Sequence, residues 1–240
     1  MAAISVLMPV WNGCRNGNES FLRLAIESIL DQTFRDIEFV IVDDGSTDNT
    51  PAILKQYASN DSRIKIIVDD RNIGIVGALN HGLRHCTSPL IARQDADDIS
   101  TVTRLELQKK FLDDRPETAM CGTGMYVINE EGKLMFEIEH ACNYGVIRSA
   151  LKSGCSFVHG SVMYRKSVID SLNGYSSDPR FQHAEDYELW VRMAKNHHIE
   201  NIPGKRFYFH RDHSSKIGNI HRAQQENASR LIMQIASETL

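Results

Sequence analysis

The hydrophobic residues of the first hundred positions fall into short continuous runs separated by longer amphipathic stretches. The runs lie at residues 4–11, 37–42, 63–68 and 89–92. Runs this short and uniformly apolar are typical of strands buried on both faces of a sheet. Between them lie three stretches with apolar side chains three and four positions apart, at residues 20–31, 50–58 and 75–86. This alternation predicts an α/β fold with a parallel, doubly wound sheet that binds ligands beyond the carboxyl ends of its strands.

The alternation ends near residue 100. Helical patterns then lie at 103–113, 185–195 and 219–240, and strand-like segments at 120–128, 134–138, 160–164 and 206–210. This irregular order predicts a mixed sheet that the second half of the chain completes. We therefore expect residues 1–100 and 101–218 to be two halves of one domain, and 219–240 to be a C-terminal helix whose apolar end needs a partner surface or a continuation of the chain.

Composition and charge narrow the class of protein. Of 240 residues, 42% are hydrophobic and 24% charged, which is typical of a globular domain. With 27 basic and 31 acidic residues the net charge is −4, so binding of nucleic acid through its phosphates is not expected. The five cysteines include no CxxC pair, which favours reduced thiols in the cytosol. Neither a secretion signal nor an apolar stretch of about 18 residues is found, so only peripheral membrane contact is left open.

Two acidic clusters follow predicted strands, at the edge where ligands are expected. Asp43 and Asp44 come directly after the second strand, and adjacent carboxylates there need hydrogen-bond donors or a cation. Residues 46–48 that follow could equally begin the next helix. Asp95 and Asp97 follow the fourth strand with a spacing that suits a hard divalent cation, Mn²⁺ or Mg²⁺, bound through oxygen. Such a cation would let an acidic protein bind a diphosphate.

Other phosphate-binding solutions are missing from the sequence. No GxGxxG follows the first strand and no GxxxxGK[ST] occurs, which excludes the common dinucleotide and P-loop sites. A haloacid-dehalogenase-type phosphatase would need aspartates after the first strand, where Trp11 and Asn12 stand. A third acidic pair, Glu185 and Asp186, opens a predicted helix. These two residues either complement the helix dipole or supply a general base.

Five ordered motifs together resemble the family 2 glycosyltransferases. They are VLMPVWN at 6–12, VDDGSTD at 42–48, NIG at 72–74, DADD at 95–98 and ED at 185–186. The resemblance covers roughly residues 4–215. It implies a GT-A fold, in which residues 1–100 bind a nucleotide-sugar and 101–218 bind the acceptor. It also implies a nucleotide-diphospho-sugar donor, a divalent metal, and inverting transfer of the sugar to a hydroxyl group.

Carried over residue by residue, the resemblance implies a role for each motif. It places in the nucleotide pocket Pro9, Asn12, Asp43, Asp44, Asp95 and Arg211. Metal binding falls to Asp97, with Asp98 and His213 as further ligands. The catalytic base is Asp186, with Glu185 beside it, and no covalent nucleophile is required. His159 and Gly160 are expected on the acceptor side, although His159 and His213 could equally be structural histidines.

The family's processive synthases carry a Gln-x-x-Arg-Trp motif and membrane spans, and both are missing here. This favours non-processive transfer of one sugar, from a UDP-sugar by prior expectation, to a saccharide or lipid-linked acceptor. The family-typical setting is bacterial surface-polysaccharide biosynthesis, in the cytoplasm or at the inner membrane face. A homodimer is left open. One alternative is a sugar-nucleotide pyrophosphorylase. Such enzymes carry a Gly-rich, basic loop after the first strand, which residues 12–17 match poorly. The other alternative is a non-catalytic sugar-nucleotide-binding partner subunit.

Overall fold

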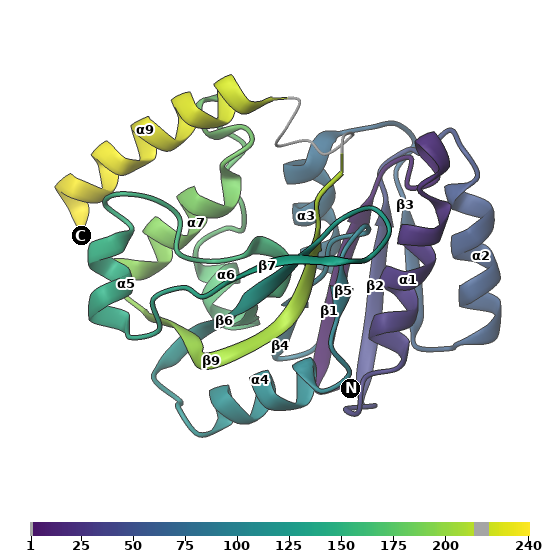
Figure 1. Cartoon of the computed structure of the whole chain (residues 1–240), viewed down its shortest axis with the longest axis horizontal. Helices are drawn as coiled ribbons and strands as arrows, with labels where there is room; N and C mark the ends of the chain where they lie inside the picture. The colour runs from purple at the N-terminus through teal and green to yellow at the C-terminus, as the bar shows by residue number, and fades with distance from the viewer. Residues whose placement is uncertain (1, 214–220) are drawn as a thin grey trace.

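The computed structural model describes residues 2–213 and 221–240 (Figure 1). In these residues one mixed sheet of nine strands has the order β3-β2-β1-β4-β8-β6-β9-β5, with β7 paired to β6. The first four strands are β1 (Ile4–Val10), β2 (Ile37–Asp43), β3 (Ile64–Val68) and β4 (Leu90–Arg93). They are joined by α1 (Glu19–Leu30), α2 (Thr50–Asn60) and α3 (Gly74–His85). These four strands pair in parallel, which confirms the doubly wound first half.

The sheet opens between β1 and β4 at its carboxyl edge. The chain runs outward from β1 to β3 and then returns to β4 on the other side of β1, which makes this a topological switch point. β4 pairs with β1 only from Ile4 to Leu7, and the amide of Gln94 donates to the oxygen of Leu7 at 3.0 Å. Pro9 lies two residues beyond Leu7, where β4 has ended. Its missing N–H therefore costs no bond to β4.

Helices cover both faces of the sheet, which gives three layers (Figure 1). The continuous apolar runs are buried on both faces because alternate side chains enter different cores. Leu7 and Val42 pack in the core formed with α3 and the C-terminal helices, whereas Val6, Met8 and Ile41 pack against α1 and α2.

The chain beyond β4 completes the sheet. Its strands are β5 (Ile99–Ser100), β6 (Thr118–Ile128), β7 (Leu134–Ile138), β8 (Met163–Arg165) and β9 (His198–Arg211). Its helices are α4 (Arg104–Asp113), α5 (Tyr144–Ala150), α6 (Lys166–Ser171), α7 (Glu185–Ala194) and α9 (Arg222–Thr239). Short 3₁₀ turns lie at Arg15–Gly17 (η1), His159–Ser161 (η2) and Pro179–Phe181 (η3). The sequence pattern did not predict β5, α5 or α6, which are all short.

The strand predicted over 160–164 is wrong in its first half. Residues 159–161 form a 3₁₀ turn, and the strand begins at Met163. Side chains stabilise this turn in place of a ladder, because Ser161 Oγ donates to the oxygen of Val158 at 3.0 Å and Arg104 donates to the oxygen of Gly160 at 2.7 Å.

The C-terminal helix finds its partner surface within the chain. In α9 the buried side chains are Ala228, Ile232 and Ala236, and the helix packs against α7 and the turn η3. The predicted boundary at 218/219 lies outside the described residues. Over residues 2–213 and 221–240, no helix combines the length and apolar character that a membrane span requires.

Candidate functional site

The carboxylates at the end of β2 are held by backbone donors. Asp43 is 1% exposed and accepts a hydrogen bond from the amide of Ser46 at 3.0 Å. Asp44 accepts from the amides of Ile73 and Gly74, at 2.6 and 3.0 Å, and so binds the start of α3. Burial nevertheless raises the pKa of Asp44, and the nearby Asp69 and Asp43 add to this effect. Hydrogen-bond donors therefore stabilise the adjacent carboxylates that the sequence left unexplained.

The end of β1 is tied to the loop after β2. Asn12 has a left-handed backbone with φ 49°, and its side chain accepts from the amide of Thr47 at 2.8 Å. Its own amide donates to Ser46 Oγ at 2.9 Å. Asp48 accepts from the amide of Thr50 at the start of α2, so part of this motif begins a helix. Trp11 remains 48% exposed beside this loop.

Asp95 lies just beyond β4, against a buried arginine. Arg93 is 1% exposed and donates to Asp95 Oδ1 at 2.6 Å. Although burial acts in the opposite direction, the Arg93 guanidinium holds the pKa of Asp95 below its usual range. The amide of Asp95 donates to Tyr208 Oη at 3.1 Å. A Cβ added at Gly160 would lie 2.6 Å from Asp95 Oδ2, so this carboxylate packs directly on the glycine.

Asp97 and His213 form a pair that fits two ligands of one divalent cation. Asp97 Oδ2 lies 2.9 Å from His213 Nε2, and the Asp97 side chain is 38% exposed. Neighbouring ligands at octahedral bond lengths of about 2.1 Å are about 3 Å apart, which matches this spacing. Among the described residues no group of three or more His, Cys, Asp or Glu side chains is arranged to hold a metal. A bound cation would therefore depend on oxygens that the substrate supplies.

Asp98 and Arg211 are turned into the protein. Asp98 is 1% exposed, accepts from the amide of Arg211 at 2.7 Å and contacts His210 Nδ1 at 3.0 Å. Burial and the charge of Asp97 raise the pKa of Asp98. The Arg211 guanidinium donates to the backbone oxygens of Asp97 and Glu130, each at 3.1 Å, and stacks 4.2 Å over the ring of Phe21. These contacts position β9 against the DADD loop.

The first turn of α7 carries two carboxyl groups that titrate near neutrality. Burial raises the pKa of Asp186 to about 6, even though its Oδ1 accepts from the amide of Tyr187 at 2.8 Å. Burial, with the neighbouring Asp186, raises the pKa of Glu185 to about 7. Among the described residues no hydrogen-bond partner reaches Glu185 Oε2. A carboxyl group with such a pKa can accept and release a proton near pH 7.

His159 is a neutral histidine close to Arg93 and Asp95. Burial and the charge of Arg93 lower the pKa of His159 to about 3. Its Nε2 lies 2.8 Å from Tyr175 Oη, and its ring is 6.1 Å from that of Trp190. Trp190 and Leu189 are both fully buried.

The structure thus gathers Asp95, His159 and Gly160 around Arg93. Sequence reasoning missed three buried residues that support this group: Arg104, Tyr175 and Tyr208. No motif signals Arg104 or Tyr175, whereas Tyr208 stands at the start of the segment that contains Arg211 and His213. The sequence pattern also assigns no role to Arg93, the last residue of β4.

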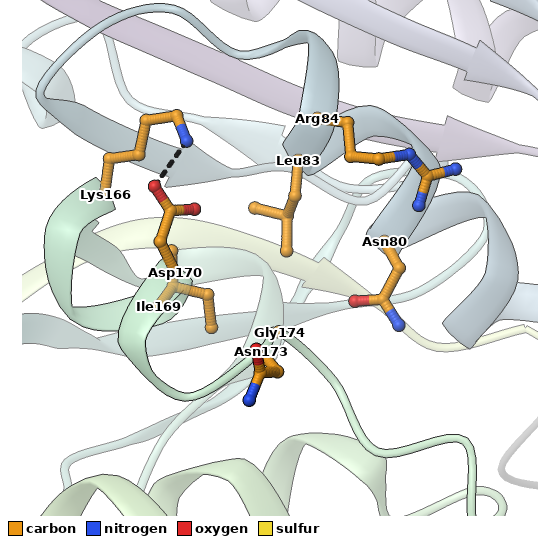
Figure 2. Close-up of a pocket in the computed structure, with 8 residues that line it drawn as sticks. All are labelled: Asn80, Leu83, Arg84, Lys166, Ile169, Asp170, Asn173 and Gly174. Atoms are coloured by element: carbon orange, nitrogen blue, oxygen red, sulfur yellow. Dashed lines mark hydrogen bonds and ion pairs between the residues drawn. The ribbon is translucent and has the colours of Figure 1, made fainter.

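Two surface hollows lie apart from these acidic residues. One, of about 500 Å³, lies between α3 and the region of α6 (Figure 2). Figure 2 shows Arg84 and Asn80 on one side and the ion pair of Lys166 with Asp170 on the other. The second, of about 390 Å³, contains Arg211 and the mostly apolar surface beside Phe21. Neither is lined by Asp44, Asp95, Asp97 or Asp186.

Two solved structures share the fold of this chain. TarS 1–349 of S. aureus in complex with UDP-GlcNAc matches with a TM-score of 0.71 and 20% identity, over 89% of this chain and 59% of that one. The mannosyltransferase PcManGT of Pyrobaculum calidifontis, in complex with GDP-Man and Mn²⁺, matches with a TM-score of 0.69 and 20% identity, over 95% and 63%. The expected GT-A fold is confirmed.

Sequence comparison identifies relatives of the same kind. The putative glycosyltransferase EpsE of Bacillus subtilis is 40% identical over 191 residues, which are 79% of this chain and 66% of that protein. The O-antigen biosynthesis glycosyltransferase WbnJ of Escherichia coli is 34% identical over 192 residues, 79% and 71%. The chain thus spans about two thirds of the length of these relatives. The family model for glycosyl transferase family 2 matches residues 5–172, and the chain belongs to this family.

Proposed function

We propose that this chain transfers one sugar from a nucleotide-diphospho-sugar to a hydroxyl group of an acceptor, with inversion at the anomeric carbon. The observation that carries the proposal is that the site contains two kinds of group, one suited to bind a cation and one suited to accept a proton. A carboxylate–imidazole pair, the partly exposed Asp97 with the buried His213, can bind a cation. A partly buried carboxyl group, Asp186, has a pKa of about 6 and is acted on by the charge of Asp95, two residues before Asp97.

In this mechanism Asp186 is the general base. It takes the proton from the acceptor hydroxyl as the oxygen attacks the sugar, and its raised pKa matches it to that task near neutral pH. A single displacement inverts the anomeric centre and needs no covalent nucleophile.

Asp97 and His213 would hold the divalent cation, Mn²⁺ or Mg²⁺. When bound, the cation supplies charge stabilisation to the departing nucleoside diphosphate. Asp95, fixed by Arg93, and the loop around Asp44 and Asn12 would orient the nucleoside. Because Asp98 and Arg211 are engaged within the protein, we assign them to positioning the DADD loop rather than to substrate contact.

The donor and acceptor follow from chemistry shared with the relatives. TarS is complexed with UDP-GlcNAc and PcManGT with GDP-Man, which supports a nucleotide-diphospho-sugar and leaves the base to experiment. WbnJ is named for O-antigen biosynthesis, which supports a saccharide or lipid-linked acceptor in surface-polysaccharide assembly.

Calorimetric titration of UDP, GDP and dTDP, with Mn²⁺ and with chelator, tests the proposal. We expect one nucleotide to bind only with the metal, and Asp97→Ala to abolish that binding. Asp113→Ala is the matched control, because it removes an exposed carboxylate from α4. Binding without turnover, and without metal-dependent donor hydrolysis, would favour the non-catalytic partner subunit. If the folded protein binds no nucleotide, the transferase proposal fails.

A further inference from the structure

Arg93 is a buried charge with an incomplete set of hydrogen bonds. Its side chain is 1% exposed, and its guanidinium donates to the backbone oxygen of Gln94 and to Asp95 Oδ1. Among the described residues no partner reaches its Nε. A guanidinium in such a place is costly unless nearby negative charge balances it. Asp95, whose side chain is 33% exposed, is the carboxylate in direct contact.

The same guanidinium lies within electrostatic reach of the carboxyl pair on α7. Burial raises the pKa values of Glu185 and Asp186, and the charge of Arg93 acts in the opposite direction on both. Other titratable groups face Asp186 from neighbouring segments: Asp95 after β4, Tyr175 after α6, and Cys155 after α5. Burial raises the pKa of Tyr175, which keeps it neutral at pH 7, and an ordinary cysteine thiol such as that of Cys155 is also mostly protonated there. Arg93 is therefore the positive charge among these groups.

We propose that Arg93 is a positioning residue that couples the donor and acceptor sides of the site. Its guanidinium fixes Asp95 by an ion pair and balances the negative charge that develops when Asp186 ionises. The role of Asp186 as base rests on the proposed function, whereas the ion pair and the charge balance do not. No contact of Arg93 with the reacting atoms is required.

The backbone around Arg93 supports this arrangement. Arg104, a second fully buried arginine, donates to the oxygens of Arg93 and Gly160 at 2.9 and 2.7 Å. Its guanidinium lies 5.5 Å from the ring of Tyr208, whose hydroxyl accepts from the amide of Asp95. Arg104 thus holds the chain on which Arg93 and Asp95 are mounted, but its hydrogen bonds go to backbone oxygens rather than to a carboxylate.

Carboxyl ¹³C NMR titration of Glu185 and Asp186 tests the charge balance without any substrate. In Arg93→Met and in Arg93→Gln, we expect the pKa of Asp186 to rise, because a charge that lowers it is lost. Arg93→Lys keeps the charge and should restore a titration close to that of the wild type. Arg165→Met is the control. The Arg165 guanidinium also donates to backbone oxygens, those of Thr118 and Leu112, but not to the chain around Asp95, so this variant should leave the Asp186 titration unchanged.

Kinetics adds a readout of coupling. The acid limb of the pH–rate profile should move upward in step with the Asp186 titration in the two neutral variants. An unchanged titration in a folded neutral variant would overturn the proposal, as would an equal shift in the control variant Arg165→Met. A raised pKa of Asp186 together with weakened nucleotide binding supports the proposal. Weakened nucleotide binding with an unchanged Asp186 titration would show that only the ion pair with Asp95 matters, and would overturn the coupling. If the wild-type protein shows no turnover, the proposed function fails, but the NMR titration of Asp186 still tests the role of Arg93.

Discussion

Replacing Gly160 by alanine should disable the site without unfolding the protein. An added Cβ would lie 2.6 Å from Asp95 Oδ2 and closer still to Tyr208 Oη, whereas ordinary contacts are 3.4–4 Å. Asp95 or Tyr208 must therefore move by about 1 Å, a displacement that can cost about 10²-fold in rate. Tyr208 is fully buried and cannot swing into solvent, so we also expect a loss of about 1–3 kcal/mol in the free energy of unfolding.

The assay compares Gly160→Ala with Gly154→Ala. A Cβ at Gly154 would meet no atom within 4 Å, so this second variant has the same chemistry without the clash. Urea unfolding measures stability, calorimetry with Mn²⁺ measures nucleotide binding, and turnover measures the rate. We expect Gly154→Ala to match the wild type within about 1 kcal/mol. A folded Gly160→Ala protein with wild-type nucleotide affinity and rate would refute the reasoning that Asp95 must stay where the structure places it.

Three further predictions concern titration and packing. Because the pKa of Asp186 is raised from 3.8 to about 6, its ionised form destabilises the folded state. Asp186→Asn should therefore be more stable than the wild type by at most about 3 kcal/mol above pH 6, and this gain should shrink as the pH falls toward 4. Urea unfolding curves that show no such pH dependence would contradict this prediction. If Asp186 is the base, the wild-type rate should fall below about pH 6, and Asp186→Asn should lose about 10²–10⁴-fold in rate while it still binds the nucleotide. A rate that stays constant down to pH 5 would argue against Asp186 as the base. Asn80 bonds both backbone groups of Tyr175 at 2.9 Å, so Asn80→Ala should cost about 1–3 kcal/mol in thermal unfolding, and a neutral effect would show that these bonds carry little.

Much of the fold was predictable because it is written in local patterns. Parallel strands buried on both faces must be continuously apolar, and β1, β2 and β4 lie within a residue or two of the predicted runs. The short elements α5, α6 and β5 escaped prediction because so few residues show no clear period and tertiary contacts stabilise them instead.

The acidic motifs were predictable as a set but not in their individual environments. The sequence alone determined that carboxylates follow β2 and β4 and open α7, since chain order places them at one edge of the sheet. Only the tertiary structure decided that Asp98 is engaged by β9 while Asp97 stays exposed beside His213, although the two are adjacent in sequence. It also decided that Arg93 lies buried among groups from β4 and α7. Burial and charge depend on which distant segments pack together, and the strength of each ionisable group follows from that packing.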